Sequence, residues 1–495
     1  MPIASRRPWT ASELAPRALK AGLPALERPI ARMSTTPPRS GSAPGAREGS
    51  LEAPTRHPLE WGDPKFYDGS ALVQELERVF DICHGCRRCF SLCNAFPTLF
   101  DAVDGTAQGE VAGVERRVFW EVVDQCYLCD MCFMTKCPYV PPHPWNVDFP
   151  HLMLRAKAAR ARTTGFTLRE RALAATDAVG RLAGIPVVAE LVNAVNRTAL
   201  GRVLLEKTLG VDRTAPLPQY HARSARQRLA ALGSTARATA APGASTVRAT
   251  ATTSGRVALF TTCYGNRNEP ALAEDLAAVF AHNGIDITLL AQERCCGMPR
   301  FELGDLEAVA RLKEFNIPRL AQAVEAGYDL VAPIPSCVLM FKQELPLMYP
   351  EDAQVRQVAA RMFDPFEYLM LRHEAGLLRT DFKATLGKVS YHVPCHLRVQ
   401  NIGLKTRDVM QLVPGTSVDT IERCSGHNGT YGLKHEFRAA SVRIGRAVVQ
   451  RVESAEADHY ASDCPMAAQQ IASGLAAPRA PEHPLRLLRL AYGLT

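Results

Sequence analysis

Two cysteine runs decide how this 495-residue chain folds: Cys83-x2-Cys86-x2-Cys89-x3-Cys93, and Cys126-x2-Cys129-x2-Cys132-x4-Cys137 followed by Pro138. Eight thiolates in two sets of four satisfy two cubane [4Fe-4S] clusters, because each iron takes one cysteine sulfur. Two zinc knuckles are the alternative, but zinc sites usually space their ligands as two separated pairs. The spacing therefore predicts two iron–sulfur clusters in this stretch.

The same spacing predicts which cysteines share a cluster. In two-cluster ferredoxins the fourth cysteine of each run binds the other cluster. We expect Cys83, Cys86, Cys89 and Cys137 to hold one cluster, and Cys126, Cys129, Cys132 and Cys93 to hold the other. Asn94 stands where proline is usual, and the second run has one extra residue before Cys137. Neither departure removes a ligand, since a bulge absorbs the extra residue.

Composition indicates a soluble protein of three or four domains, with 47% hydrophobic and 22% charged residues. No apolar run approaches eighteen residues, so we expect no transmembrane helix. The N-terminus lacks the apolar core of a secretion signal. Fifteen cysteines without such a signal favour metal centres in a reducing compartment over disulfides. We expect a cytoplasmic protein, either free or peripheral on the inner face of the membrane.

Positive charge is concentrated in residues 151–254, with 16 Lys+Arg against 5 Asp+Glu, although the whole chain carries only +8. Such a surface suits anionic lipid or an acidic partner, and we expect no nucleic-acid partner because no reading motif accompanies the arginines. Within this region, Leu191, Val195, Leu200, Val203 and Leu204 recur at roughly helical spacing. We favour helices packed on their own protein over a basic amphipathic face for a membrane or partner.

The pattern predicts six segments. These are a disordered extension (1–56), an α-helical domain (57–150), a helical connecting region (151–221), a flexible linker (222–254), and two α/β modules (255–384 and 385–495). Whether Met33 is the true start stays open. In the first domain we expect Ser70 to cap a helix that leads into Cys83, and a second helix over 114–123.

Strands alternate with helices twice after residue 254, and each predicted strand runs into a cysteine. The expected strands are 257–262, 285–290 and 329–334, leading to Cys263, Cys295-Cys296 and Cys337, and then 388–393, 419–422 and 458–461, leading to Cys395, Cys424 and Cys464. In a parallel sheet, ligands bind at the edge formed by the carboxyl ends of the strands. The repeat therefore predicts a second region of metal-ligating thiols.

Both modules resemble the cysteine-rich (CCG) domains of heterodisulfide reductase and of lactate- and glycolate-oxidising iron–sulfur proteins. The first domain resembles the α-helical ferredoxin domain of succinate dehydrogenase and fumarate reductase. The whole order is similar to the C-subunit family of anaerobic glycerol-3-phosphate dehydrogenase, and Arg423-Cys424-Ser425-Gly426 resembles a stretch found in that family.

The resemblance implies five cysteines for each noncubane [4Fe-4S] cluster. The first module supplies four (Cys263, Cys295, Cys296, Cys337) with Met340 in the fifth place, so we expect one further cluster there. The second supplies three (Cys395, Cys424, Cys464), with Ser425 and Ala467 in the other places. It must use other ligands, bind another metal or bind none. His396, His427, His435 and Asp463 are the candidate replacements, and we expect this weaker module to be the reactive end.

Three functions fit these patterns. There is no GxGxxG or GxxxxGK[ST] motif, so flavin or nicotinamide chemistry belongs to another polypeptide. We favour an iron–sulfur protein that transfers electrons from a flavoprotein, which oxidises glycerol 3-phosphate or a 2-hydroxy acid, to a quinone or disulfide. The alternatives are a disulfide or thiol reductase in the CCG region and a redox sensor or scaffold. The candidate catalytic residues are Cys395, Cys424, Cys464, His396 and His427.

Overall fold

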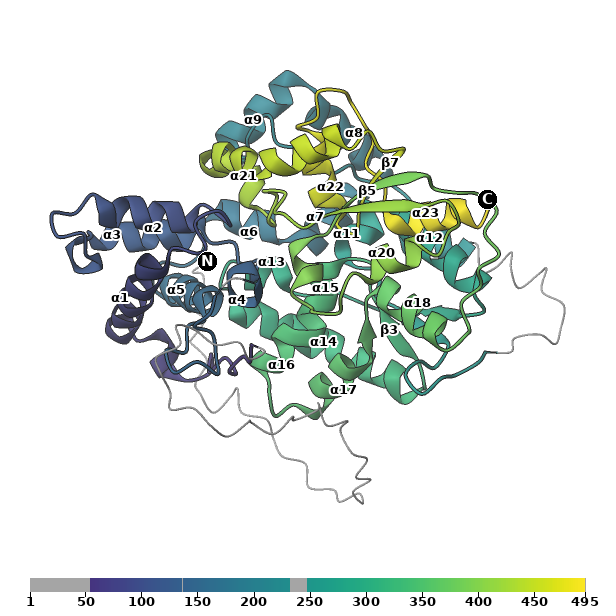
Figure 1. Ribbon diagram of the computed structural model, residues 1–495, viewed down its shortest axis with the longest axis horizontal. Coiled ribbons are helices and arrows are strands. Elements are labelled where there is room, and N and C mark those ends of the chain that lie inside the picture. The colour runs from purple at the N-terminus through teal and green to yellow at the C-terminus, as the bar shows by residue number, and fades with distance from the viewer. Residues whose placement is uncertain (1–53, 136, 232–246, 495) are drawn as a thin grey trace, which may run out of the picture. The chain divides into compact units, whose positions relative to one another are not determined.

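Two parallel β-sheets organise the C-terminal half of the chain in the computed structural model, which describes residues 54–135, 137–231 and 247–494 (Figure 1). The first sheet has the strand order β2-β1-β3-β4 and the second β6-β5-β7. The strands are β1 (Arg256–Leu259), β2 (Asp286–Leu289), β3 (Asp329–Val331), β4 (Met362–Phe363), β5 (Lys388–His392), β6 (Ser417–Ile421) and β7 (His459–Ser462). All pairs are parallel, as predicted.

Each sheet is covered by the helices that connect its strands, which is how parallel sheets are normally buried. Val257, Ala258 and Leu259 of the central strand β1 are fully buried. The helices of this half are α11 (Cys263–Arg267), α12 (Pro270–His282), α13 (Met298–Phe301), α14 (Leu306–Glu325), α15 (Pro335–Leu339), α16 (Leu345–Met348), α17 (Ala353–Arg361), α18 (Pro365–Glu374), α19 (Cys395–Arg398), α20 (Lys405–Met410), α21 (His435–Ser454), α22 (Pro465–Ala472) and α23 (Pro484–Ala491). Most strands are shorter than predicted, because the chain turns early to place the cysteines beyond them.

The N-terminal part is helical, as predicted, but its first helix is capped differently. Its helices are α1 (Gly69–Cys86), α2 (Ala95–Asp104), α3 (Arg116–Gln125) and α4 (Met131–Thr135). The Asp68 carboxylate accepts a hydrogen bond from Ala71 N at 2.7 Å, so Asp68, not Ser70, is the N-cap. A carboxylate at this position is the stronger cap because it also interacts favourably with the helix dipole.

The folded part begins earlier than residue 57. Arg56 is largely covered, with 12% of its side chain exposed, and forms ion pairs with Asp130, Asp148 and Glu344, so the predicted boundary of the disordered extension is wrong at this residue. Three carboxylates around one guanidinium fix the chain here, because a buried charge must be paired. The rest of the predicted extension up to residue 53, including Met33, lies outside the described residues.

Five helices connect the two halves: α5 (Phe149–Thr164), α6 (Leu168–Ala174), α7 (Thr176–Ala183), α8 (Pro186–Arg197) and α9 (Ala199–Leu209). The expectation that the apolar stripe packs on its own protein is wrong. Val187 is 76% exposed, Leu191 63% and Leu204 57%. These helices bury their small residues instead: Ala183, Ala189 and Gly201 face inward, which turns the large side chains to the surface.

The predicted linker 222–254 is not flexible throughout. Residues 225–231 are helical, and Ala225 at their start is fully buried. Arg226 donates a hydrogen bond to the main-chain oxygen of Leu290, which holds this helix against the first sheet. Residues 232–246 lie outside the described part of the chain.

One property of the helices bears on membranes. Among the described residues, no single helix is long and apolar enough to cross a bilayer. The pair α7 and α8, bent by 105° at the break between them, meets the length and composition criteria only when its two helices are taken together.

Candidate cysteine-lined redox centres

The first predicted set of thiols surrounds a small apolar hollow at the end of α1. The last turns of α1 carry Cys83 and Cys86, the following loop carries Cys89, and Cys137 arrives after α4. These four cysteines line the hollow together with Ile82, Phe96, Tyr139 and Val147. Four soft donors in an apolar shell suit a four-iron cluster.

The second predicted set lines a neighbouring hollow. Its cysteines are Cys93, Cys126, Cys129 and Cys132, and its apolar wall includes Leu92, Phe96, Phe149 and Pro150. Phe96 thus contributes to both hollows. Cys137 N donates to Cys132 O at 2.8 Å, so the extra residue of the second run is taken up in this local turn. The structure groups the eight cysteines as the spacing predicts, including the exchange of Cys93 and Cys137, while their role as ligands stays a prediction.

Four thiols of the first module lie close together. Cys263 Sγ lies 3.9 Å from Cys295 Sγ, and the Cys296 thiol interacts electrostatically with the thiols of Cys295 and Cys337. Asp177 of α7 accepts a hydrogen bond from Cys295 N at 2.6 Å and so anchors the cysteine pair. These four thiols offer one ligand for each iron of a four-iron cluster, so no further ligand is needed. Met340, in the fifth place, is fully buried.

The second module meets the N-terminal part at its cysteines. The Cys395 thiol interacts with the thiols of Cys424 and Cys129, and the Tyr127 hydroxyl lies 3.5 Å from Cys424 Sγ. Cys129, which the sequence assigns to a cubane, therefore also lies against the second module. Cys464 is the third cysteine of the second module. Burial raises the pKa of its thiol to about 11, and this thiol interacts electrostatically with Cys337 of the first module.

The candidate replacement ligands fall in different places. Burial lowers the pKa of His427 to about 4, so its imidazole is neutral, and its Nε2 has no hydrogen-bond partner in the described part of the chain. His396 Nδ1 lies 2.8 Å from Ser336 Oγ. Asp463 accepts a hydrogen bond from Thr406 at 3.1 Å. His435 is paired with Glu206 at 2.8 Å and is not brought to the cysteines.

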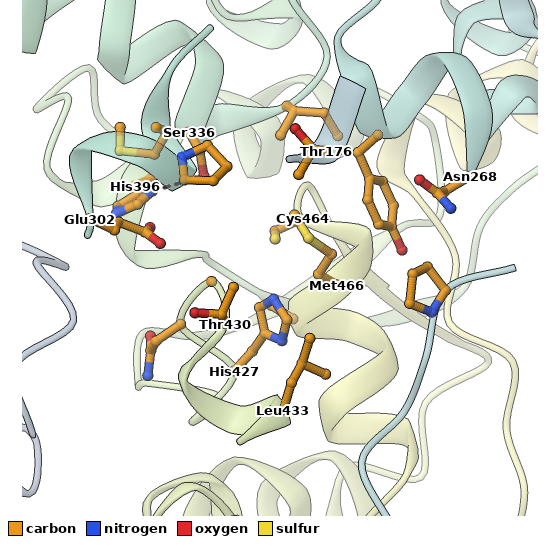
Figure 2. Close-up of a pocket in the computed structure, with 18 of the residues that line it drawn as sticks. Thr176, Asn268, Glu302, Ser336, His396, His427, Thr430, Leu433, Cys464 and Met466 are labelled. Atoms are coloured by element: carbon orange, nitrogen blue, oxygen red, sulfur yellow. Dashed lines mark hydrogen bonds between the residues drawn. The ribbon is translucent and has the colours of Figure 1, made fainter. Parts of the chain in front are cut away.

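A cavity of about 300 Å³ lies between the two modules. Cysteines of both modules and of the N-terminal part line it: Cys129, Cys263, Cys296, Cys337, Cys395 and Cys464. Figure 2 shows Cys464, His427 and Glu302 around the same hollow. Much of the remaining wall is apolar, with side chains such as Val179, Leu217, Met298 and Leu433. A small redox partner could therefore be held among thiols from the N-terminal part and from both modules.

Sequence reasoning missed two residues of this site. Tyr127 lies between Cys126 and Cys129 in the chain, so its position in the cysteine run could have drawn attention to it. Its ring packs on Tyr431 with centroids 5.0 Å apart, which closes the junction with the second module. Glu302 carries no sequence signal, because only the fold brings α13 to the cavity.

Comparison with known proteins supports the repeat. Residues 257–342 and 389–471 match the family described as the cysteine-rich domain (CCG). The chain is 28% identical over 356 residues, covering 70% of it and 83% of the relative, to the C-subunit of anaerobic glycerol-3-phosphate dehydrogenase from Escherichia coli (strain K12). It is 26% identical over 186 residues to lactate utilization protein A of an Exiguobacterium species, covering 36% and 74% of the two chains. Against the B-subunit of fumarate reductase (CoM/CoB) from Methanothermobacter marburgensis it is 24% identical over 225 residues, covering 44% and 42%. The predicted resemblance of the two modules to cysteine-rich (CCG) domains is confirmed, whereas the resemblance of the N-terminal part to an α-helical ferredoxin domain stays a prediction.

Proposed function

We propose that this chain, with its two cysteine-rich domains, is the iron–sulfur electron-transfer subunit of a dehydrogenase or reductase complex. The observation that carries the proposal is that thiols of the N-terminal part and of both modules line one cavity: Cys129, Cys263, Cys296, Cys337, Cys395 and Cys464. Cys129 also lines the second N-terminal hollow, so that set of thiols borders the cavity.

Iron–sulfur clusters held by these thiols would supply one-electron transfer. Cys83, Cys86, Cys89 and Cys137 would hold one cluster, Cys93, Cys126, Cys129 and Cys132 a second, and Cys263, Cys295, Cys296 and Cys337 a third. The protein's contribution is to hold the thiols in largely apolar surroundings, which tunes the clusters that they would bind.

The electron donor in this proposal is a flavoprotein that oxidises a small hydroxylated substrate, such as glycerol 3-phosphate or a 2-hydroxy acid. Two of the relatives are named as subunits, which supports a role in a larger complex. The chain has no dinucleotide fingerprint of its own, so the hydride chemistry must lie elsewhere.

A quinone is the acceptor that the cavity favours. Its wall is largely apolar, and a quinone head offers carbonyl oxygens to donors such as the Tyr264 hydroxyl. Val179 of α7 lines the cavity and is also exposed, next to the outward apolar side chains of α7 and α8. A lipid-soluble acceptor could follow this apolar surface. A disulfide is the second candidate, because cysteines of both modules face the same space.

The outward face of α8 and α9 is proposed as the contact with anionic lipid. Its apolar residues are Val187, Leu191, Leu200 and Leu204, and exposed Arg197 and Lys207 lie at the ends of the same helices. A cleft beside them is lined by Arg197, Arg202 and Arg213, which suits phosphate head groups. The protein would then lie on the membrane surface.

Iron and sulfide analysis of anaerobically purified protein tests the proposal. Two cubane sites require at least eight irons and eight sulfides, since each cluster contains four of each. Cys86→Ser should remove one EPR signal and leave the other. The control variant Leu490→Ser, which changes an exposed side chain on α23, should keep the full content. Stoichiometric zinc without sulfide would refute the iron–sulfur hypothesis, and full clusters that no quinone or disulfide oxidises would refute the acceptor site.

A further inference from the structure

One carboxylic acid lines the cavity without belonging to any thiol set. Glu302 follows α13, which starts two residues after the Cys295-Cys296 pair and so ties this side chain to the first module. Figure 2 shows its carboxyl group on the cavity wall. The group packs against the backbone of Gly429, where a Cβ atom would collide with it and where φ is +58°. The glycine turn therefore leaves room for the acid.

Two lysines face Glu302 from other elements. Lys157 of α5 donates hydrogen bonds to the main-chain oxygens of Glu302 (3.3 Å) and Cys126. Lys434, just before α21, also interacts with the carboxylate. Both lysines lower the pKa of Glu302, whereas the Cys295 thiol raises it. Burial nevertheless outweighs the lysines and raises the pKa of Glu302 to about 7. An acid in this range can give up and regain a proton near neutral pH.

Lys434 lies in the electrostatic field of charged groups nearer the surface. This lysine interacts with Arg169, Glu170 and Glu436. Arg169 and Glu436 form an ion pair at the surface. Charged groups thus extend from the cavity wall to the exterior, and Glu302 is the member of this series that lines the cavity.

We infer that Glu302 is the proton donor for the acceptor that is reduced in the cavity. The inference rests on the proposed function. A quinone that takes up two electrons from the reduced protein also needs two protons, one for each carbonyl oxygen. Glu302 protonates the carbonyl oxygen that faces it: the O–H bond of Glu302 breaks and an O–H bond forms on the quinone. The other carbonyl oxygen takes its proton from solvent, and the Glu302 carboxylate regains a proton from solvent after the transfer.

Glu302→Gln in the full chain tests this role. Anaerobic protein is reduced with dithionite, freed of excess reductant and mixed with a short-chain naphthoquinone between pH 5.5 and 8.5. In the unchanged protein the rate should fall as pH rises through the pKa of Glu302, since only the protonated acid donates. General acids typically contribute 10²–10⁴-fold, so the variant should be slowed at least roughly 100-fold below pH 7 and should lose this pH dependence. Its solvent deuterium isotope effect should change as well.

Three controls separate the outcomes. Glu269 is a half-buried acid with a raised pKa that pairs with Gln469 at 3.0 Å and does not line the cavity, so Glu269→Gln should behave as the unchanged protein. Ferricyanide takes electrons without protons and should oxidise every variant equally. Glu302→Asp keeps a carboxylic acid, so its rate of quinone reduction should still fall as pH rises. This variant tests the proton-donor role even if Glu302→Gln folds poorly.

Equal pH profiles and isotope effects for Glu302→Gln and the unchanged protein would overturn the proton-donor role and leave the proposed function standing. A loss of ferricyanide oxidation in the variant would also overturn it, because the defect would then lie in the electron path. If the unchanged protein reduces neither the quinone nor a disulfide, the proposed acceptor site itself fails, and the role of Glu302 with it.

Discussion

Removing apolar side chains from the outward face of α8 should weaken binding to anionic vesicles. Val187 and Leu191 are 76% and 63% exposed and lie one helical turn apart, so both can enter the same interface. Fully burying such a side chain contributes about 1.5–3 kcal/mol. At two-thirds exposure each has about 1–2 kcal/mol left to gain, or about 2–4 kcal/mol for the pair. The double serine variant should therefore bind roughly 30- to 1,000-fold more weakly.

Co-sedimentation with vesicles of mixed neutral and anionic phospholipid measures this affinity. Leu490→Ser on α23 is the matched control, since Leu490 is also exposed (39%) but lies outside the connecting helices. Affinity should fall with salt, because the Debye length is about 8 Å at physiological ionic strength. Circular dichroism must show that serine leaves the helix content unchanged. If the double variant and the control bind equally well, the outward face of α8 is not the membrane contact.

Two further predictions concern buried contacts. Arg56→Met removes the partner of Asp130 and Glu344, so the free energy of unfolding should fall by about 3–5 kcal/mol in denaturant titrations. Arg117 is exposed, so Arg117→Met should lower the free energy of unfolding by less than about 1 kcal/mol. Equal losses of unfolding free energy in the two variants would contradict the prediction. Tyr127→Phe removes a hydrogen bond worth about 0.5–1.5 kcal/mol from the Cys424 sulfur, so a redox centre there should become roughly 20–60 mV harder to reduce in an EPR-monitored titration. An unchanged potential would show that this hydroxyl does not tune the centre.

The grouping of the cysteines could be predicted from the sequence where it depends on local spacing. Three-residue steps between cysteines place thiols on one short segment, so the two N-terminal sets could be predicted before any fold was known. The strand-to-cysteine repeat worked for a similar reason, because apolar runs such as Val257–Leu259 end where the polar turn begins. Both patterns depend on neighbours in the chain, which is what periodicity reports.

Features that depend on distant contacts could not be predicted in this way. The outward face of α8 has the same apolar spacing that a buried helix would have, and only the inward packing of Ala189 decides which side is covered. Glu302 likewise becomes notable only once Gly429, far along the chain, packs against it. Ser70 illustrates a smaller error, since Asp68 two residues earlier offers the better capping group.

The shared cavity of Cys129 and Cys395 bears on which module is the reactive end. In the first module Cys263, Cys295, Cys296 and Cys337 interact with one another, so a cluster there would already have four sulfur ligands. In the second module Cys395 and Cys424 lie together beside the N-terminal thiols, whereas Cys464 interacts across the cavity with Cys337. A site with separated donors would leave coordination positions open toward the cavity, and Figure 2 shows that Cys464 lies on the cavity wall. Electrons from the N-terminal thiols would reach this incomplete side first, and the proton donor Glu302 lines the same cavity, so both requirements of a two-electron, two-proton acceptor meet there.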